Sequence, residues 1–387
     1  MDLTFTPEQE RLRSEAAAWL AANVPDPSLA SMDTAEGFEA HRAWERRLHD
    51  AGWAIVAWPQ EYGGRGLDLV EWLVFEEEYW RSGAPGRVGQ NGLFLLGPTL
   101  MEHGTDEQRQ RFLPPMARAD EIWCQGWSEP EAGSDLASLR STARRDGDEW
   151  VLNGQKIWVS RGAFGEWMFG LFRSDPDSER HRGLSFILVP MDADGIDVRP
   201  IAQLDGETGF AEVFLDDVRV PAELCTVGEP GDGWRIAMST AGFERGVSLR
   251  SPGRFLAPAE RLVARWVKSA ADPGRPSARE DVLDAWMDAE AYRLYQYRTV
   301  CHVLEGGTVG FEASLNKLFW SQMDLHLHET ALRLLGTDAV LAGDEAPDDG
   351  GWLDGFLFAL AGPIYAGTNQ IQRNIVAERV LDLPRSR

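Results

Sequence analysis

A segment rich in hydrogen-bond donors lies near the middle of the chain, between Trp123 and Ser160. Its first half, with Ser128-Glu129-Pro130, disfavours the start of a helix, because a proline restricts the residue before it. Gly133-Ser134-Asp135 then supplies a permissive backbone with N–H and hydroxyl groups. Groups of this kind can donate hydrogen bonds to a phosphate or to the polar edge of a heterocycle. The loop is therefore the first candidate for a ligand-binding site.

Two turn dipeptides in the second half of this segment predict a small antiparallel sheet. Asp146-Gly147 and Asn153-Gly154 both suit the two-residue turns of β-hairpins, and the apolar stretch Trp150-Val151-Leu152 lies between them. We therefore expect the donor-rich loop to lead directly into short strands, which would hold it in place.

Length and composition indicate a large folded protein. The chain has 387 residues, of which 43% are hydrophobic and 26% charged, as is ordinary for a soluble protein of two or three domains. Its net charge of −24 argues against binding to nucleic acid or docking on an anionic membrane. No stretch of about 18 apolar residues is present, so no membrane-spanning helix is expected.

The cysteines and the N-terminus bear on the cellular compartment. Cys124, Cys225 and Cys301 are too few for a disulfide scaffold, and their spacing is not that of metal ligands. The N-terminus has neither the basic region nor the apolar core of a signal peptide. We therefore expect a reducing, cytoplasmic compartment and no metal site.

The spacing of apolar residues changes twice along the chain. Residues 1–120 follow the three- and four-residue spacing of helices, and Thr6-Pro7-Glu8-Gln9 is a typical helix start. Residues 121–229 alternate and are broken by close turns, which predicts a small β-sandwich or barrel, and residues 230–387 return to helical spacing. The result is an α+β fold of three domains. Strands are expected at Trp150–Leu152, Lys156–Ser160, Trp167–Phe172, Leu184–Val189 and Ala211–Leu215.

Two long helices are predicted in the C-terminal part, at residues 278–303 and 311–335. In the second, Leu315, Leu318, Phe319 and Met323 follow one another at steps of three, one and four, and we expect them to face the core.

The chain resembles the acyl-CoA dehydrogenase family over essentially its whole length. That family has an N-terminal helical domain, a middle β-domain and a C-terminal four-helix bundle, with FAD between the β-domain and the bundle. A single one of the matching blocks would be weak evidence, but they occur in the family's order and at similar spacing. The blocks are WPQEYGG (58–64), SEPEAGSD (128–135), NGQKIWVS (153–160) and YAGTNQIQR (365–373).

This resemblance implies a set of residues around FAD. Most belong to the loop and strand described above, and the others to the C-terminal block. If these residues had only structural roles, the tryptophans would lie in the core and the serines would form hydrogen bonds within turns and at strand edges. The implied set has Trp127 and Ser128 at the flavin edge, Gly133 and Ser134 near the cofactor phosphate and the thioester ligand, Trp158 and Ser160 beside the isoalloxazine, and Thr368 and Gln370 further along.

The resemblance also implies a reaction, the removal of two hydrogens across Cα–Cβ of an acyl-CoA thioester. A carboxylate must take the α-proton. The family usually carries it directly before the Gly-Thr of the C-terminal block, where this chain has Ala366. A second family arrangement places this carboxylate on the first long C-terminal helix, at the position that is Glu244 in this chain. We therefore expect Glu244 to be the base, Arg245 to pair with a carboxylate or the ligand, and the Ala366 backbone N–H to donate to the thioester oxygen.

Two further departures concern the half-site that such a chain offers to a neighbouring subunit's FAD. An Arg-x-Phe-Gly element is replaced by Pro273–Arg279, and a Gln-x-x-Gly-Gly-x-Gly element by Arg333–Ala339. A different, homologous subunit would explain the loss. Some actinobacterial dehydrogenases of sterol side-chain CoA esters form such α2β2 tetramers, and the chain resembles their base-carrying subunit. A bulky acyl-CoA is the expected substrate, a steroid side-chain ester being one candidate, with an electron-transfer flavoprotein as acceptor.

Other functions are open at this point. An acyl-CoA oxidase or a flavin monooxygenase could share the fold, and its reduced flavin would react rapidly with oxygen. A non-catalytic partner subunit would agree with Ala366 but not with Glu244. A homotetramer with every flavin site filled is the alternative to the heterotetramer.

Overall fold

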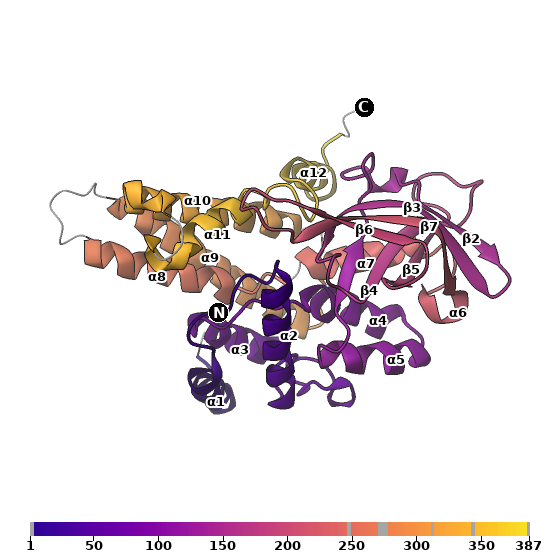
Figure 1. Ribbon diagram of the computed structural model, residues 1–387. Coiled ribbons are helices and arrows are strands. Elements are labelled where there is room, and N and C mark those ends of the chain that lie inside the picture. The colour runs from indigo at the N-terminus through magenta and orange to yellow at the C-terminus, as the bar shows by residue number, and fades with distance from the viewer. Residues whose placement is uncertain (1–3, 246–248, 270–277, 311–312, 342–344, 385–387) are drawn as a thin grey trace. The chain divides into compact units, whose positions relative to one another are not determined.

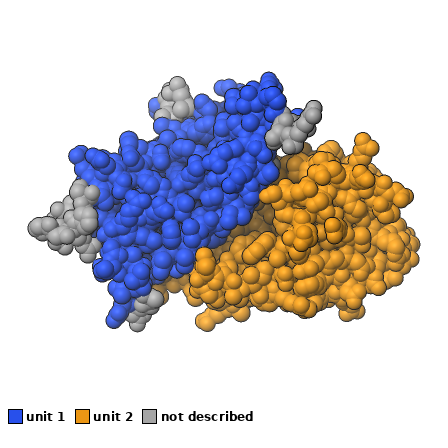
Figure 2. All heavy atoms as spheres, turned by 90° about the horizontal axis from the view of Figure 1, so that it is seen from above, with its two compact units in different colours: residues 1–24, 68–84, 245–387 blue, residues 25–67, 85–244 orange. Residues whose placement is uncertain are grey.

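The computed structural model describes residues 4–245, 249–269, 278–310, 313–341 and 345–384 (Figure 1). The fold is α+β, as predicted, with a helical N-terminal part, a middle β-sheet and a helical C-terminal part. Contacts divide the chain into two compact units, coloured separately in Figure 2. Unit 1 comprises Met1–Val24, Asp68–Ala84 and Arg245–Arg387, and unit 2 comprises Pro25–Leu67 and Pro85–Glu244. Two segments of the predicted N-terminal domain thus pack with the C-terminal helices.

The sheet forms the centre of unit 2. Its eight strands follow the order β6-β7-β3-β2-β4-β5-β8, and β1 pairs in parallel with β4. Strands β4 and β5 are buried over almost their whole length, and Phe169 stacks on Phe186 between them. The strands are β1 (Trp123–Gly126), β2 (Thr142–Asp146), β3 (Glu149–Ser160), β4 (Trp167–Arg173), β5 (Leu184–Pro190), β6 (Ile196–Ile201), β7 (Phe210–Pro221) and β8 (Thr226–Val227).

Helices also belong to unit 2, and the last of them carries the candidate base Glu244 near its end. Thr105 caps one of them through a capping box with Gln108, whose side chain also reaches the carbonyl oxygens of Leu224 and Thr226. The helices are α2 (Ala35–Asp50), α4 (Gly97–His103), α5 (Asp106–Ala117), α6 (Ala222–Cys225) and α7 (Gly233–Arg245), whose last residue is assigned to unit 1.

One of the two predicted hairpin turns is wrong. Asp146 pairs with Glu149 across a tight turn, as expected, but Asn153 and Gly154 lie inside the long strand β3. The register shifts between Leu152 and Gly154, and Gly154 has a φ of 145°. A Cβ on Gly154 would lie 2.2 Å from Ser141 Oγ, so a side chain could not be accommodated. The dipeptide therefore forms a β-bulge rather than a turn.

Unit 1 is built from helices of both ends of the chain. The capping box predicted at Thr6 and Gln9 starts its first helix. Phe255, Tyr292, Trp320 and Leu327 lie in the core between the later helices. The helices are α1 (Pro7–Asn23), α3 (Leu69–Arg81), α8 (Gly253–Ser269), α9 (Arg279–Leu304), α10 (Ala313–Leu335), α11 (Gly351–Ala359) and α12 (Asn369–Ile375). No described helix has the length and apolar character needed to cross a membrane.

The inward face predicted for α10 is also partly wrong. Met323 is buried, but Leu315 and Phe319 are 42% and 39% exposed. The buried face includes Asn316 and Lys317 instead, because distant partners satisfy them. Gln296 Nε2 donates to Asn316 Oδ1 at 2.9 Å, and Lys317 Nζ donates to Asn369 Oδ1 at 2.7 Å. Paired polar side chains can occupy a core that an apolar pattern would assign elsewhere.

Helix α3 carries three consecutive buried glutamates, Glu76 to Glu78. Glu77 accepts hydrogen bonds from Arg293 at 2.6 Å and from the Tyr297 hydroxyl at 3.0 Å. Glu76 accepts one from Ser251 Oγ at 2.8 Å. These bonds fix α3 against α9 and against the residues just before α8.

Candidate functional site

The donor-rich loop is folded around Glu129. The backbone N–H groups of Glu129 and Ala132 donate to each other's carbonyl oxygens, at 3.1 and 3.0 Å, which closes a tight turn. The Glu129 carboxylate accepts the backbone N–H groups of Arg140, at 2.6 Å, and Ser141, at 2.9 Å. A single buried carboxylate thus sets the path of the whole loop.

A buried lysine links this carboxylate to the sheet. Lys156 Nζ lies 2.8 Å from Glu129 Oε1 and 2.7 Å from the Leu171 carbonyl oxygen, and its side chain is fully buried. Burial alone would raise the pKa of Glu129, but the charge and hydrogen bond of Lys156 outweigh it and lower this pKa. Sequence reasoning missed this pair. The available signal was a lysine directly before the apolar residues Ile157-Trp158-Val159 of a predicted strand.

Trp158 is held in an unusual position beside the loop. The N–H of its neighbour Ile157 donates to the Ser128 carbonyl oxygen at 2.9 Å, which ties β3 to the loop. Trp158 has a φ of 60°, in the left-handed region, at a second irregularity of β3. Such a conformation costs roughly 1–3 kcal/mol for a residue with a side chain. Its ring is 56% exposed, with Phe210 at its edge, so Trp158 is not a core residue.

Several donors around this loop are unused within the protein. Among the described residues, the hydroxyls of Ser128, Ser134 and Ser160 form no hydrogen bond, and the buried indole N–H of Trp127 has no acceptor. A Cβ on Gly133 would meet nothing within 4 Å. Available hydroxyls, an orphaned indole N–H and an exposed aromatic face fit a ligand with a flat ring and many acceptors, which is the chemistry of a flavin nucleotide.

Glu244 is the second-last residue of α7 and is half-buried. The preceding turn of the helix is anchored, since the Thr240 and Thr99 hydroxyls meet at 2.8 Å in a buried contact. Ser239 donates to Glu102 at 2.9 Å. The Arg245 side chain and Gly246 lie outside the described part of the chain, as do residues 273–277 of the segment in which the family's phenylalanine is missing.

The C-terminal block forms a strained turn in unit 1. Ala366 and Gly367 have φ values of 55° and 78°. The Gln372 side chain donates to both of their carbonyl oxygens, at 3.0 and 3.3 Å. Thr368 caps α12 by accepting the Ile371 N–H at 3.2 Å, whereas Gln370 is exposed.

The predicted site residues therefore fall into two groups. The structure brings Trp127, Ser128, Trp158 and Ser160 together on the loop and β3 of unit 2. Gly133, Ser134 and Glu244 also belong to unit 2, while Ala366, Thr368 and Gln370 belong to unit 1.

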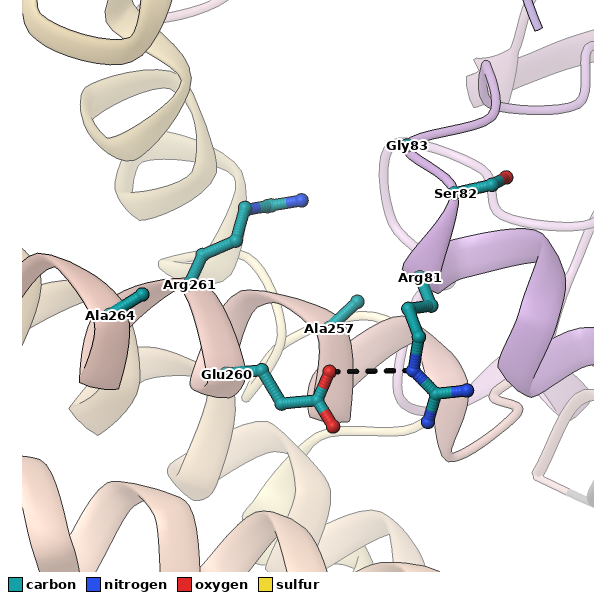
Figure 3. Close-up of a pocket in the computed structure, with 7 residues that line it drawn as sticks. All are labelled: Arg81, Ser82, Gly83, Ala257, Glu260, Arg261 and Ala264. Atoms are coloured by element: carbon teal, nitrogen blue, oxygen red, sulfur yellow. Dashed lines mark ion pairs between the residues drawn. The ribbon is translucent and has the colours of Figure 1, made fainter. Parts of the chain in front are cut away.

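A hollow of about 360 Å³ in unit 1 lies between the end of α3 and α8. Figure 3 shows Arg81 and Glu260 pointing toward each other across it, at 3.6 Å. Arg81 also pairs with Glu78, so its charge is already neutralised. No predicted site residue lines this hollow. Its lining is Arg81, Ser82, Gly83, Ala257, Glu260, Arg261 and Ala264.

Comparisons with known proteins identify the family. The chain matches three family models, for the acyl-CoA dehydrogenase N-terminal domain at residues 6–120, the middle domain at 124–218 and the C-terminal domain at 231–381. It is 44% identical to the acyl-CoA dehydrogenase IpdE1 of Mycobacterium tuberculosis, over 97% of this chain and 98% of that protein.

Two solved structures are similar over the full length of both chains. One is a chain of the "Tcur3481-Tcur3483 steroid ACAD", with a TM-score of 0.89 and 30% identity, covering 100% of each chain. The other is a chain of the ChsE4-ChsE5 complex from Mycobacterium tuberculosis, with a TM-score of 0.83, 30% identity and the same coverage. The chain belongs to the acyl-CoA dehydrogenase family of enzymes.

Proposed function

We propose that this protein catalyses the FAD-dependent α,β-dehydrogenation of an acyl-CoA thioester, with Glu244 as the base. The observation that carries the flavin part is the set of unused donors beside the exposed Trp158. The placement of the base is supported by a half-buried carboxylate at the end of an anchored helix, in a chain that has alanine at position 366.

The flavin-binding residues are those of the loop, the strand β3 and the C-terminal block. Trp127 and Ser128 would meet the edge of the ring, Trp158 its face and Ser160 the region of N5. Gly133 and Ser134 would lie near cofactor phosphate and the thioester ligand, with Thr368 and Gln370 further along. When bound, FAD supplies the acceptor for the β-hydrogen and its electron pair.

The chain's own residues handle the proton and the developing charge. The Glu244 carboxylate takes the α-proton, and the electron pair of the broken C–H bond moves into the new Cα=Cβ bond as hydride leaves Cβ. Negative charge grows on the thioester oxygen as the proton leaves. The Ala366 N–H is suited to stabilise this charge, because a backbone donor needs no side chain. Arg245, which directly follows Glu244, would pair with a carboxylate or with the ligand.

Replacing Glu244 by glutamine tests the base directly. We expect kcat to fall about 100-fold or more, because a positioned base typically contributes that much, with FAD content unchanged. Glu229→Gln, an exposed glutamate upstream of α7, is the matched control and should keep full activity. Turnover of E244Q equal to that of the control would show that Glu244 is not the base and would favour a non-catalytic subunit.

The electron acceptor separates the proposed dehydrogenase from its alternatives. An electron-transfer flavoprotein should reoxidise the reduced enzyme, and oxygen should do so slowly. Rapid reoxidation by oxygen in a stopped-flow measurement would instead favour an oxidase or a monooxygenase.

The similar proteins support a finer proposal for substrate and partner. One related structure is named a steroid ACAD, and both similar structures are named as two-component assemblies. We infer a bulky, steroid-derived acyl-CoA as substrate and a homologous second subunit in an α2β2 complex in the cytoplasm. Mass and flavin content, measured for the chain alone and with a homologous partner, test this. A homotetramer of this chain with FAD bound in every site would overturn the proposal of a second subunit.

A further inference from the structure

Arg250 is a buried cation that no step above uses. It lies six residues after Glu244, in the stretch before α8, and is only 6% exposed. Its guanidinium carbon lies over two aromatic rings, 5.0 Å from the centre of the Trp320 ring and 5.1 Å from that of Tyr365. The two rings are themselves stacked, with centres 5.8 Å apart.

The charge of Arg250 has no counter-ion among the described residues. No carboxylate there pairs with the guanidinium, and its buried Nε has no acceptor. A buried ion is costly unless it is paired and hydrogen-bonded. Cation–π contacts of this kind offset only part of that desolvation cost. The unpaired guanidinium lowers the stability of the fold, so its presence at this position points to a role in function.

The backbone around Arg250 is fixed from two sides. The Tyr292 hydroxyl of α9 donates to the Arg250 carbonyl oxygen at 2.8 Å. On the other side, Ser251 donates to Glu76 of α3. A Cβ on Gly253 would lie 2.6 Å from the Glu76 carbonyl oxygen, so the chain runs directly against α3. The guanidinium is therefore presented from a rigid base.

Tyr365, the ring under Arg250, directly precedes the strained Ala366-Gly367 turn. Gln372 holds the carbonyl oxygens of that turn, as described above. The stack of Arg250, Trp320 and Tyr365 holds its other end. Between these two supports lies the Ala366 N–H, the donor proposed for the thioester oxygen.

We propose that Arg250 is a positioning residue that locks Tyr365 and thereby aims the Ala366 N–H at the thioester carbonyl. Its positive charge also favours the negative charge that develops there. This inference rests on the proposed function, because it assigns a partner to the thioester oxygen.

The chain offers a closely matched control. Arg254, four residues further along, also lies over two rings of unit 1, 5.7 Å from Trp80 and 5.7 Å from Phe358. It is half-buried and does not lie over Tyr365 itself, although its ring Phe358 packs against Tyr365 with centres 6.1 Å apart. R250M and R254M therefore share the loss of an arginine from an aromatic stack, and R250M alone removes the direct contact of a guanidinium with Tyr365.

The first test is kinetic, on the assembled holoenzyme. R250M should lower kcat by about tenfold or more, with KM changed little, because the lost contact acts mainly as charge develops. R250K should recover part of the loss by restoring the charge, and R254M should keep kcat. Equal effects of R250M and R254M on kcat would overturn the proposal, as would a wild-type kcat in R250M.

The second test is a binding measurement that needs no turnover. A thioether analogue has a methylene in place of the thioester carbonyl, so it cannot accept the Ala366 N–H. Calorimetry should show the wild type preferring the enoyl thioester over its thioether by roughly tenfold, the worth of one net hydrogen bond. R250M or, if it fails to fold, R250K and Tyr365→Leu should reduce this ratio. An unchanged ratio would overturn the proposal.

These outcomes remain separable from the test of the base. If E244Q is inactive while R250M behaves like R254M, the proposed function stands and Arg250 has no positioning role. If E244Q is active, the base assignment is wrong whatever Arg250 does.

Discussion

Glu45 offers a sharp test of the electrostatics of unit 2. It lies on α2, is 1% exposed, and accepts the Gly89 N–H through Oε1 at 2.8 Å. Its other oxygen has no partner among the described residues. Burial raises the pKa of Glu45 from 4.5 to about 7, although the Gly89 hydrogen bond and the charges of Arg87 and Arg161 oppose this.

The direction of the resulting pH dependence follows from proton counting. Between pH 4.5 and about 7 the folded protein holds a proton that the unfolded chain has lost. The free energy of unfolding therefore falls as pH rises through this window. At about 1.4 kcal/mol for each pH unit between the two pKa values, the ionised Glu45 costs about 3 kcal/mol above pH 7.

Glu45→Gln removes this cost, because the amide keeps an acceptor for the Gly89 N–H and cannot ionise. At pH 5 the variant should match the wild type. At pH 8 it should be more stable by up to about 3 kcal/mol, less whatever attraction to Arg87 and Arg161 is lost. In thermal unfolding this is a rise of several degrees in Tm.

The control is Glu39→Gln, an exposed glutamate on the same helix, which should show no such change between the two pH values. An E45Q protein that gains nothing at pH 8, or gains equally at pH 5 and pH 8, would refute the reasoning.

The remaining predictions concern the loop and β3. Lys156→Met leaves the buried Glu129 unpaired and should destabilise by roughly 3–5 kcal/mol in denaturant unfolding, with most of the loss restored by adding Glu129→Gln. Failure of the double variant to recover stability would argue against an electrostatic origin. Trp158→Gly relieves a left-handed backbone and should leave the apoprotein's stability within about 1 kcal/mol of wild type, while FAD affinity falls at least about tenfold. Wild-type FAD affinity in a titration would show that this ring does not contact the flavin.

Local sequence signals predicted much of the fold. The capping boxes at Thr6 and Thr105 work over three residues, so they are legible without any tertiary contact. The apolar stretches of β4 and β5 were likewise found, with an error of one residue at the C-terminal end of each. The positions of individual helices and strands are thus largely encoded in the local sequence.

The failures have a common physical cause in distant contacts. Asn153-Gly154 has the composition of a turn, but the close approach of Ser141 makes it a bulge. The face of α10 was misassigned because Asn369, far along the chain, satisfies the buried Lys317. In both cases the deciding partner lies outside any local pattern.

The candidate site divides in the same way. The loop donors and Trp158 were named as candidates from the family's motifs, and Glu244 as the candidate base from the family's second arrangement, since position 366 is alanine. The residues that hold these groups were not, because Lys156 and Arg250 act through partners that only the folded chain brings to them.

The discontinuity of unit 1 has a consequence for biosynthesis. Helix α3 is synthesised early, yet Arg293 and Tyr297, which donate hydrogen bonds to Glu77, follow it by 216 and 220 residues. Until α9 has left the ribosome, α1 and α3 have no core to join, whereas all of Pro25–Leu67 and Pro85–Glu244 is already available to unit 2. A nascent chain should therefore pass through a stage with one finished unit and two exposed helices, open to chaperones and proteases. A chain truncated after Glu244 would be fixed at that stage.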